Sequence, residues 1–129
     1  MSEEQLDRYL DRRRFCVLAT ATPSGTPQAR PVAFVRLDGT LWFATVDGAR
    51  LRNVRANRRV SVVIEQGDRD EHAMVLLEGR VTIHEDDETR ERFTAAWREQ
   101  QGCTAAWAAA FLELQPARVF SYVATAAKV

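Results

Sequence analysis

The feature that most constrains the fold is the pair Asp38-Gly39, which stands between two runs of residues that favour β-structure. A two-residue hairpin turn of this type needs positive φ at both central positions, and Asp-Gly adopts them readily. The run before the pair, residues 28–37, alternates in polarity, whereas the run after it, residues 40–46, is apolar on both faces from Leu41 to Ala44. Such a strand is typical of burial on two sides. The sequence therefore predicts an antiparallel hairpin whose second strand lies inside the protein.

Four further segments, residues 15–22, 60–65, 74–84 and 117–124, also have the composition of strands. Gly79 in the middle of the third predicts a bulge or a close approach of another backbone. With the hairpin this makes six strands, several of them joined by short turns. We therefore expect an α+β fold with a six-stranded antiparallel, barrel-like sheet and peripheral helices.

Capping residues indicate where the helices begin. The predicted caps are, in chain order, Ser2 in a capping box with Gln5, then Asp47, then Asp86 or Asp87, and finally Thr104. The last of these helices is expected to end at Pro116. Trp97, Trp107 and Phe111 have helical spacing, which indicates core or dimer contacts rather than stacking on a cofactor.

Length and charge limit the classes of protein and partner. The 129 residues fit one domain, residues 1–129, without an internal boundary. Eighteen basic and eighteen acidic residues cancel, so no net field attracts nucleic acid or an anionic membrane, and we interpret the arginines between residues 52 and 59 as solvated surface. No apolar run reaches the roughly 20 residues that span a bilayer, and residues 1–14 lack the apolar stretch of a secretory signal. We expect a cytoplasmic protein with reduced Cys16 and Cys103.

Two kinds of catalytic site are poorly supported. A serine or cysteine nucleophile needs a base, and the two histidines are His72, in a predicted charged loop, and His84, at a predicted strand end. No residues have the spacing of a zinc site. The acidic residues 85–88 are better explained by the dipole of the helix that follows them. The sequence thus favours neither a hydrolase nor a metal centre.

The segment from Thr45 to Asn53 combines a strand end, Gly48 and a helix start that carries arginines. Backbone N–H groups, the helix dipole, a hydroxyl and a guanidinium can converge on one anion at such a place. Arg50 and Asn53 are three residues apart and share a helical face. The pattern indicates a phosphate site, with Asp47 turned into its capping role. A solvated, arginine-rich helix surface remains the alternative on this segment alone.

Five motifs extend the pattern over nearly the whole chain. They are LATATPSGTPQARPV at residues 18–32, LWFAT at 41–45, RLRN at 50–53, LEGRV at 77–81 and PARV at 116–119. In this order and spacing the chain resembles the pyridoxamine 5'-phosphate oxidase-like split β-barrel family of flavin- and deazaflavin-binding proteins. The resemblance implies a split barrel and a homodimer with a cofactor in each of two interface clefts.

Transferred position by position, the resemblance also implies a cofactor site. It places the flavin ring along Arg30, Pro31 and Val32, by side chains or backbone. The remaining implied residues run toward the phosphate or hold it: Phe43, Ala44, Thr45, Arg50, Leu51 and Asn53.

The function implied is that of an FMN-binding oxidoreductase that passes a hydride or electrons between a reduced nicotinamide and a small-molecule substrate. The family usually has lysine at position 50, and arginine keeps the charge. Deazaflavin-binding members tend to have a further basic residue just before it, where this chain has Gly48 and Ala49, so FMN is preferred to a deazaflavin coenzyme. A deazaflavin-dependent reductase and a non-catalytic carrier or sensor of flavin or haem remain the alternatives.

Overall fold

The structure is a computed structural model that describes residues 1–67 and 70–125. Its three helices are α1 (Glu3–Asp11), α2 (Ala49–Ala56) and α3 (Asp87–Gln101). The strands are β1 (Phe15–Ala21), β2 (Pro27–Ala33), β3 (Val35–Leu37), β4 (Thr40–Thr45), β5 (Arg59–Gly67), β6 (Glu71–His84) and β7 (Ala110–Thr125). No helix in the described part of the chain is long and apolar enough to cross a membrane.

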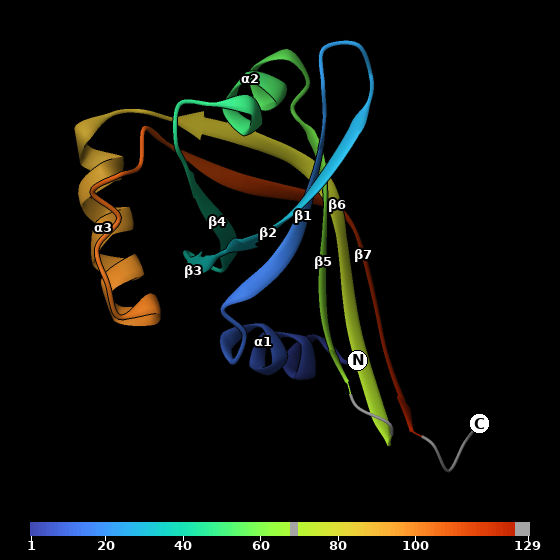
Figure 1. Ribbon diagram of the computed structural model, residues 1–129. Coiled ribbons are helices and arrows are strands. Elements are labelled where there is room, and N and C mark those ends of the chain that lie inside the picture. Colours follow the sequence, from blue (N-terminus) through green and yellow to red (C-terminus); the bar gives the residue numbers. More distant parts are fainter. Residues whose placement is uncertain (68–69, 126–129) are drawn as a thin grey trace.

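All strands belong to one antiparallel sheet, and its two edge strands, β2 and β3, follow one another directly in the chain. The strand order is β2-β1-β5-β6-β7-β4-β3, so β2 and β3 lie at opposite edges although only Phe34 separates them. The chain itself therefore curls the sheet into a split barrel (Figure 1). The prediction of six strands is wrong by one, because the run expected as a single strand over residues 28–37 bends at Phe34 and pairs with β1 before the bend and with β4 after it.

Two glutamines at the end of α3 hold this bend. The Gln100 amide accepts from the Arg36 N–H at 2.7 Å and donates to the Arg36 carbonyl at 2.6 Å, much as a neighbouring strand would. The Gln101 amide donates to the carbonyl of Phe34 at 2.8 Å and to that of Arg14 at 3.1 Å. The backbone groups at the bend thus have partners without a further strand.

The core has two parts, and β4 belongs to both. Leu41 and Phe43 face the barrel interior, whereas Trp42 and Ala44 face α3. The expectation of a strand buried on both sides is therefore confirmed.

Local turn and cap signals are mostly confirmed. Ser2 and Gln5 form the capping box of α1, and Asp86 accepts from the Thr89 N–H as the cap of α3. Asp38 and Gly39 both have positive φ. The prediction that Asp47 caps α2 is wrong, because the N-cap is Gly48, whose extended backbone leaves Asp47 outside the helix and exposed.

The predicted helix from Thr104 is wrong, since β7 begins at Ala110 and runs through Pro116. Phe111 packs toward α3, whereas Leu112 and Leu114 pack inside the barrel. Burial on both sides removes the alternation that identifies a strand. Pro116 is tolerated at a bulge opposite Gly79, where a Cβ would lie 2.1 Å from the Gln115 carbonyl oxygen. The bulge or close approach predicted at Gly79 is thus confirmed.

The hairpin of β5 and β6 is longer than predicted. His72, expected in a charged loop, lies within β6 and pairs with Gly67. Residues 68 and 69, also assigned to that loop, lie outside the described residues.

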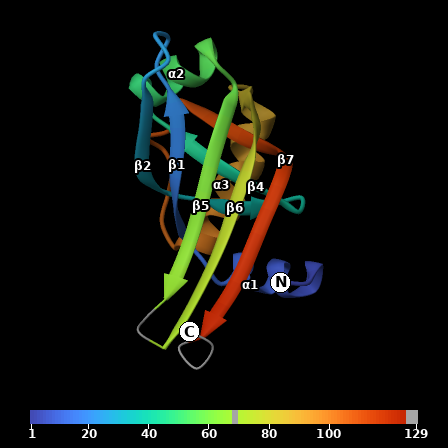
Figure 2. The same ribbon diagram turned by 90° about the vertical axis from the view of Figure 1, so that its right-hand side faces the viewer.

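The outer face of β2, β1, β5, β6 and β7 is not covered by α1, α2 or α3 (Figure 2). This face carries a row of apolar side chains. In the pairing register this row consists of Pro31, Val17, Val63, Leu76 and Phe120. Phe120 is 58% exposed and Val17 is 39% exposed. We call these five residues the outer row.

Replacing Gln100 with leucine removes both hydrogen bonds to Arg36 while keeping a side chain of similar size. We expect the free energy of unfolding to fall by about 1–3 kcal/mol, because backbone groups at the bend lose their partners. Urea titration measures this change. Gln115→Leu, at an exposed position of β7, is the control, and equal losses in both variants would contradict the role of Gln100.

The two cysteines should differ in reactivity. Cys16 is buried in the barrel core, and burial raises the pKa of its thiol to about 12, against the opposing effect of Arg50. At pH 8 only about one Cys16 in ten thousand is then a thiolate, the reactive form. Cys103 is exposed. Iodoacetamide followed by mass spectrometry should label Cys103 in the native protein and Cys16 only after unfolding; equal native rates would show that Cys16 is accessible.

Candidate functional site

A hollow of about 350 Å³ lies where the start of α2 meets β1, β2 and the end of β4. Its volume lies within the range of small-molecule sites. We call it the α2 hollow and define it by its lining residues: Leu18, Thr20, Gln28, Arg30, Pro31, Thr45, Val46, Ala49 and Arg50.

The structure brings together four of the nine residues that the sequence assigned to a cofactor. Arg30, Pro31, Thr45 and Arg50 line the α2 hollow. The other five do not line it. The side chains of Val32, Phe43, Ala44 and Leu51 are packed in the two cores, and that of Asn53 is buried behind the hollow.

Two arginines give the α2 hollow a positive charge. The Arg50 side chain makes no hydrogen bond or ion pair within residues 1–67 and 70–125, and the Arg30 guanidinium donates only to the neighbouring carbonyl of Ala29, at 2.9 Å. Burial lowers the pKa of the Arg50 guanidinium; the Cys16 thiol opposes this effect and Arg30 adds to it. A guanidinium still carries its charge at neutral pH. None of the nine lining residues is acidic, so the site offers two cations without a counter-charge.

The first turn of α2 adds backbone donors. Its first internal hydrogen bond runs from the Arg52 N–H to the Gly48 carbonyl, so the N–H groups of residues 49–51 precede the helical ladder. Gly48 supplies no side-chain cap, and the first turn of α2 holds no acidic residue. By contrast, α1 and α3 each have a capping side chain and acidic residues in the first turn. Donors at the positive end of a helix dipole favour an anion.

Asn53 acts on the α2 hollow through two other side chains. Its amide nitrogen donates to Thr20 Oγ1 at 3.1 Å and to Gln28 Oε1 at 2.9 Å. Both bonds together tie α2 to the first hairpin and leave the Gln28 amide nitrogen free to donate toward a ligand. The sequence interpretation missed Thr20 and Gln28. The sequence signal that could have identified them is a polar residue at an inward-facing position of a strand, Thr20 in β1 and Gln28 in β2.

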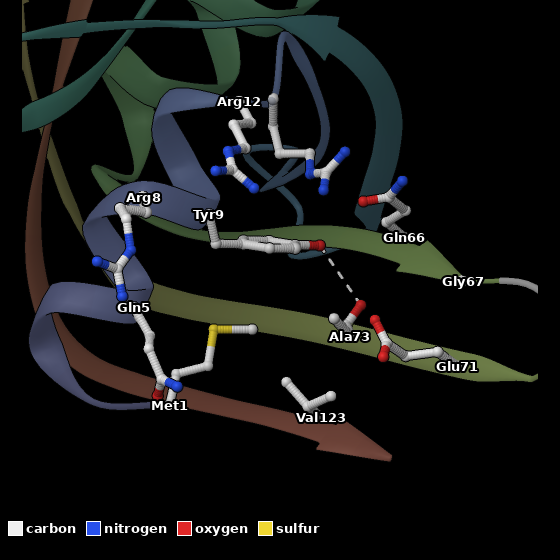
Figure 3. Close-up of a pocket in the computed structure, with 11 residues that line it drawn as sticks. Met1, Gln5, Arg8, Tyr9, Arg12, Gln66, Gly67, Glu71, Ala73 and Val123 are labelled. Atoms are coloured by element: carbon white, nitrogen blue, oxygen red, sulfur yellow. Dashed lines mark hydrogen bonds between the residues drawn. The ribbon is translucent and has the colours of Figure 1, made fainter. Parts of the chain in front are cut away.

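A larger cavity, about 500 Å³, lies between α1 and the ends of β5 and β6 (Figure 3). The Tyr9 hydroxyl lies 3.4 Å from the carbonyl oxygens of Ile64 and Ala73, and the Arg13 guanidinium covers the ring. None of the sequence-assigned site residues lines this cavity.

The histidines lie outside the α2 hollow. His84 Nε2 is 2.9 Å from Glu113 Oε1, and the ring stacks on Trp42. In the described parts of the chain, no three His, Cys, Asp or Glu side chains gather closely enough to hold a metal ion.

Comparison with solved structures agrees with the split barrel. A conserved hypothetical protein from Mycobacterium tuberculosis has a TM-score of 0.84 and 25% sequence identity, over 95% of this chain and 84% of that chain. A FAD-binding protein from Mesorhizobium loti has a TM-score of 0.81 and 22% identity, over 97% of this chain and 96% of that chain. At this level of identity the second likeness concerns the fold alone.

Comparison of sequences identifies the family. The chain is 34% identical over 107 residues to a pyridoxine/pyridoxamine 5'-phosphate oxidase from Rubrobacter xylanophilus. The aligned region covers 77% of this chain and 49% of the relative. It therefore spans about half the length of that relative. A model of the pyridoxamine 5'-phosphate oxidase family matches residues 2–127. Together with the 34% identity and the split barrel, this match shows that the chain belongs to the pyridoxamine 5'-phosphate oxidase family.

Proposed function

We propose that the α2 hollow binds FMN and that the chain works as a flavin-dependent oxidoreductase, transferring electrons from a reduced nicotinamide to a small-molecule substrate. The observation that carries this proposal is the unpaired Arg50 guanidinium beside Arg30, at an uncapped helix start and without an acidic residue in the lining. This set of donors fits a phosphate monoester.

The ring of the cofactor would lie along β2. This strand pairs only with β1, so its other edge presents backbone N–H and C=O groups that have no partner in a sheet. Arg30 and Pro31 line the α2 hollow on this edge, and Val32 would contribute its backbone, since its side chain is in the core. A flavin ring has donor and acceptor atoms along one side that suit such an edge.

The remaining sequence-assigned residues would support the cofactor in different ways. Thr45 lies in the lining with its hydroxyl donating to the Val46 carbonyl at 3.0 Å. Phe43, Ala44 and Leu51 would hold the strand and the helix in place from the core. When bound, the flavin supplies the transfer of the hydride or electron pair, and the chain supplies position and charge.

Two features favour FMN over the alternatives. Ala49 lines the α2 hollow with a methyl group, where a deazaflavin coenzyme would be expected to meet a further base. A haem iron needs an axial His, Cys, Met or Tyr, and none of the nine lining residues is of these types.

We further propose that the chain forms a homodimer through the outer row. The outer row crosses five strands, is apolar at every position, and begins at Pro31, which also lines the α2 hollow. A second copy on this face would bury exposed apolar surface and cover the open side of the hollow. A second copy is the partner we propose, because in a two-fold symmetric dimer the outer row of one subunit packs against the outer row of the other.

The absorption spectrum of protein purified without added ligand, and again after adding FMN, tests the cofactor. We expect the two-band flavin spectrum, and Arg50→Ala should weaken FMN binding by about 1.5–3 kcal/mol, since a charged hydrogen bond to phosphate is lost. Arg50→Lys should weaken it less. The control is Arg52→Ala, an exposed position on the same helix outside the lining. If the wild-type protein binds no FMN, or shows a Soret or deazaflavin band instead, the FMN proposal fails.

Sedimentation velocity tests the homodimer. We expect about twice the 14.6 kDa of one chain, and Leu76→Lys should give monomers because it places a charge within the apolar contact. Thr82→Lys, an exposed residue on the same strand outside the outer row, should remain dimeric. A monomeric wild-type protein would contradict the homodimer.

A further inference from the structure

The cavity of about 500 Å³ beside α1 has one charged wall and one mostly apolar wall (Figure 3). We call it the α1 cavity. The charged wall is a stripe of α1 and its C-cap with the helical spacing i, i+3, i+4, i+7 and i+8: Gln5, Arg8, Tyr9, Arg12 and Arg13. The opposite wall includes a register row that crosses β5, β6 and β7: Gln66, Ala73 and Val123. The stripe and the row thus face each other across the cavity.

Two of the three arginines in the stripe have no acidic partner. Arg8 pairs with Glu4 at 3.3 Å, whereas Arg12 and Arg13 form no ion pair within residues 1–67 and 70–125. In this part of the chain the Nε of Arg13 is buried and has no hydrogen-bond acceptor. A buried donor without a partner is uncommon and costs stability. The dipole of α1 favours cations at its end, but it supplies no acceptor for this nitrogen.

Tyr9 holds Arg13 in position without cancelling its charge. The guanidinium carbon of Arg13 lies 4.7 Å from the centre of the Tyr9 ring. The Tyr9 hydroxyl lies 3.4 Å from the carbonyl oxygens of Ile64 and Ala73, which anchors the ring to β5 and β6. Burial raises the pKa of this hydroxyl, against the opposing effect of Arg13, so the phenol is neutral at pH 7. The positive charge of the stripe therefore remains available to a ligand.

The two walls together define the chemistry of a ligand. A guanidinium binds the two oxygens of a carboxylate as a fork, which would supply the acceptor that Arg13 lacks. Ala73 and Val123 offer apolar surface, from which an inorganic anion gains nothing and a hydrocarbon chain gains by burial. The lining also contains the acidic Glu71, which disfavours a ligand with two negative charges, such as a phosphate monoester. The volume of about 500 Å³ lies within the range of small-molecule sites.

We propose that the α1 cavity binds an organic carboxylate with an apolar body, its carboxylate on Arg12 and Arg13 and its chain along Ala73 and Val123. The α1 cavity and the α2 hollow have no lining residue in common. The chain therefore has a second ligand site, of different chemistry, on the other side of β1 from α2. Binding there does not depend on a flavin.

Isothermal titration calorimetry with sodium octanoate tests the ligand class. We expect one octanoate per chain, bound at least about tenfold more tightly than each of three partial ligands, because one charged hydrogen bond or a short buried chain contributes at least that much. Acetate has the carboxylate without the chain, 1-octanol has the chain without the charge, and inorganic phosphate has charge alone. Absence of octanoate binding, or equal affinity for 1-octanol or phosphate, would overturn the proposal.

The arginines have a matched control in α3. Arg12→Gln and Arg13→Gln should each weaken octanoate binding by at least about tenfold, since a charged hydrogen bond is lost. Arg98→Gln removes a positive charge from the last turn of α3, outside the α1 cavity, and should leave the affinity unchanged. Arg12 is exposed, so its variant keeps the test valid if Arg13→Gln fails to fold. Equal losses in the Arg12 and Arg98 variants would show that only net charge matters.

Two-dimensional NMR spectra show where octanoate binds. The backbone amide signals of Tyr9, Ala73 and Val123 should shift during the titration, whereas that of Arg50 in the α2 hollow should not. Shifts confined to the outer row would indicate adsorption on the exposed apolar face and overturn the proposal.

The two proposed sites can fail separately. FMN binding should be unchanged in Arg12→Gln, because Arg12 does not line the α2 hollow. Protein that binds octanoate but no FMN would contradict the proposed function and leave the α1 cavity standing as a carboxylate site. Protein that binds FMN but no octanoate would do the reverse.

Discussion

The bend at Phe34 is the constraint on which the rest of the structure depends. It sends one continuous run of chain from the β1 edge of the sheet to the β4 edge, so the sheet curls around a core instead of remaining open. The same bend leaves β2 and β4 as neighbours without a ladder between them. The α2 hollow lies in that seam, with α2 across its end. Gln100 and Gln101 support the bend from outside the sheet, so α3 contributes to the site without contacting it.

Features encoded within a few residues were predictable, and features decided by tertiary contacts were not. The capping box at Ser2, the Asp38-Gly39 turn and the bulge at Gly79 depend on backbone angles that few residues adopt. The bend at Phe34 has no such signature, because the alternation of residues 28–37 continues through it. The alanine-rich segment before Phe111 favours a helix by propensity. Residues 104–109 nevertheless form no helix, and the chain that follows, from Ala110, is a strand buried between the barrel interior and α3.

The candidate site shows the same division. Arg50 was predictable because a glycine, a helix start and a guanidinium follow one another in sequence. The direction of Asn53 was not, since helical spacing places it on the face of Arg50 but burial turns its amide toward Thr20 and Gln28. The α1 cavity was hidden for another reason. Its two walls come from α1 and from three different strands, and no sequence pattern connects them.

The two hydrogen bonds of Asn53 have a consequence for how any ligand would be received. They tie α2 to the two strands beside it, so the arginine, the helix N–H groups and the strand edge are held in place without a ligand. Binding then needs little loss of conformational freedom in the protein. A loop carrying the same groups would have to order itself around each ligand. One buried amide thus fixes the arrangement that the proposed cofactor site would need.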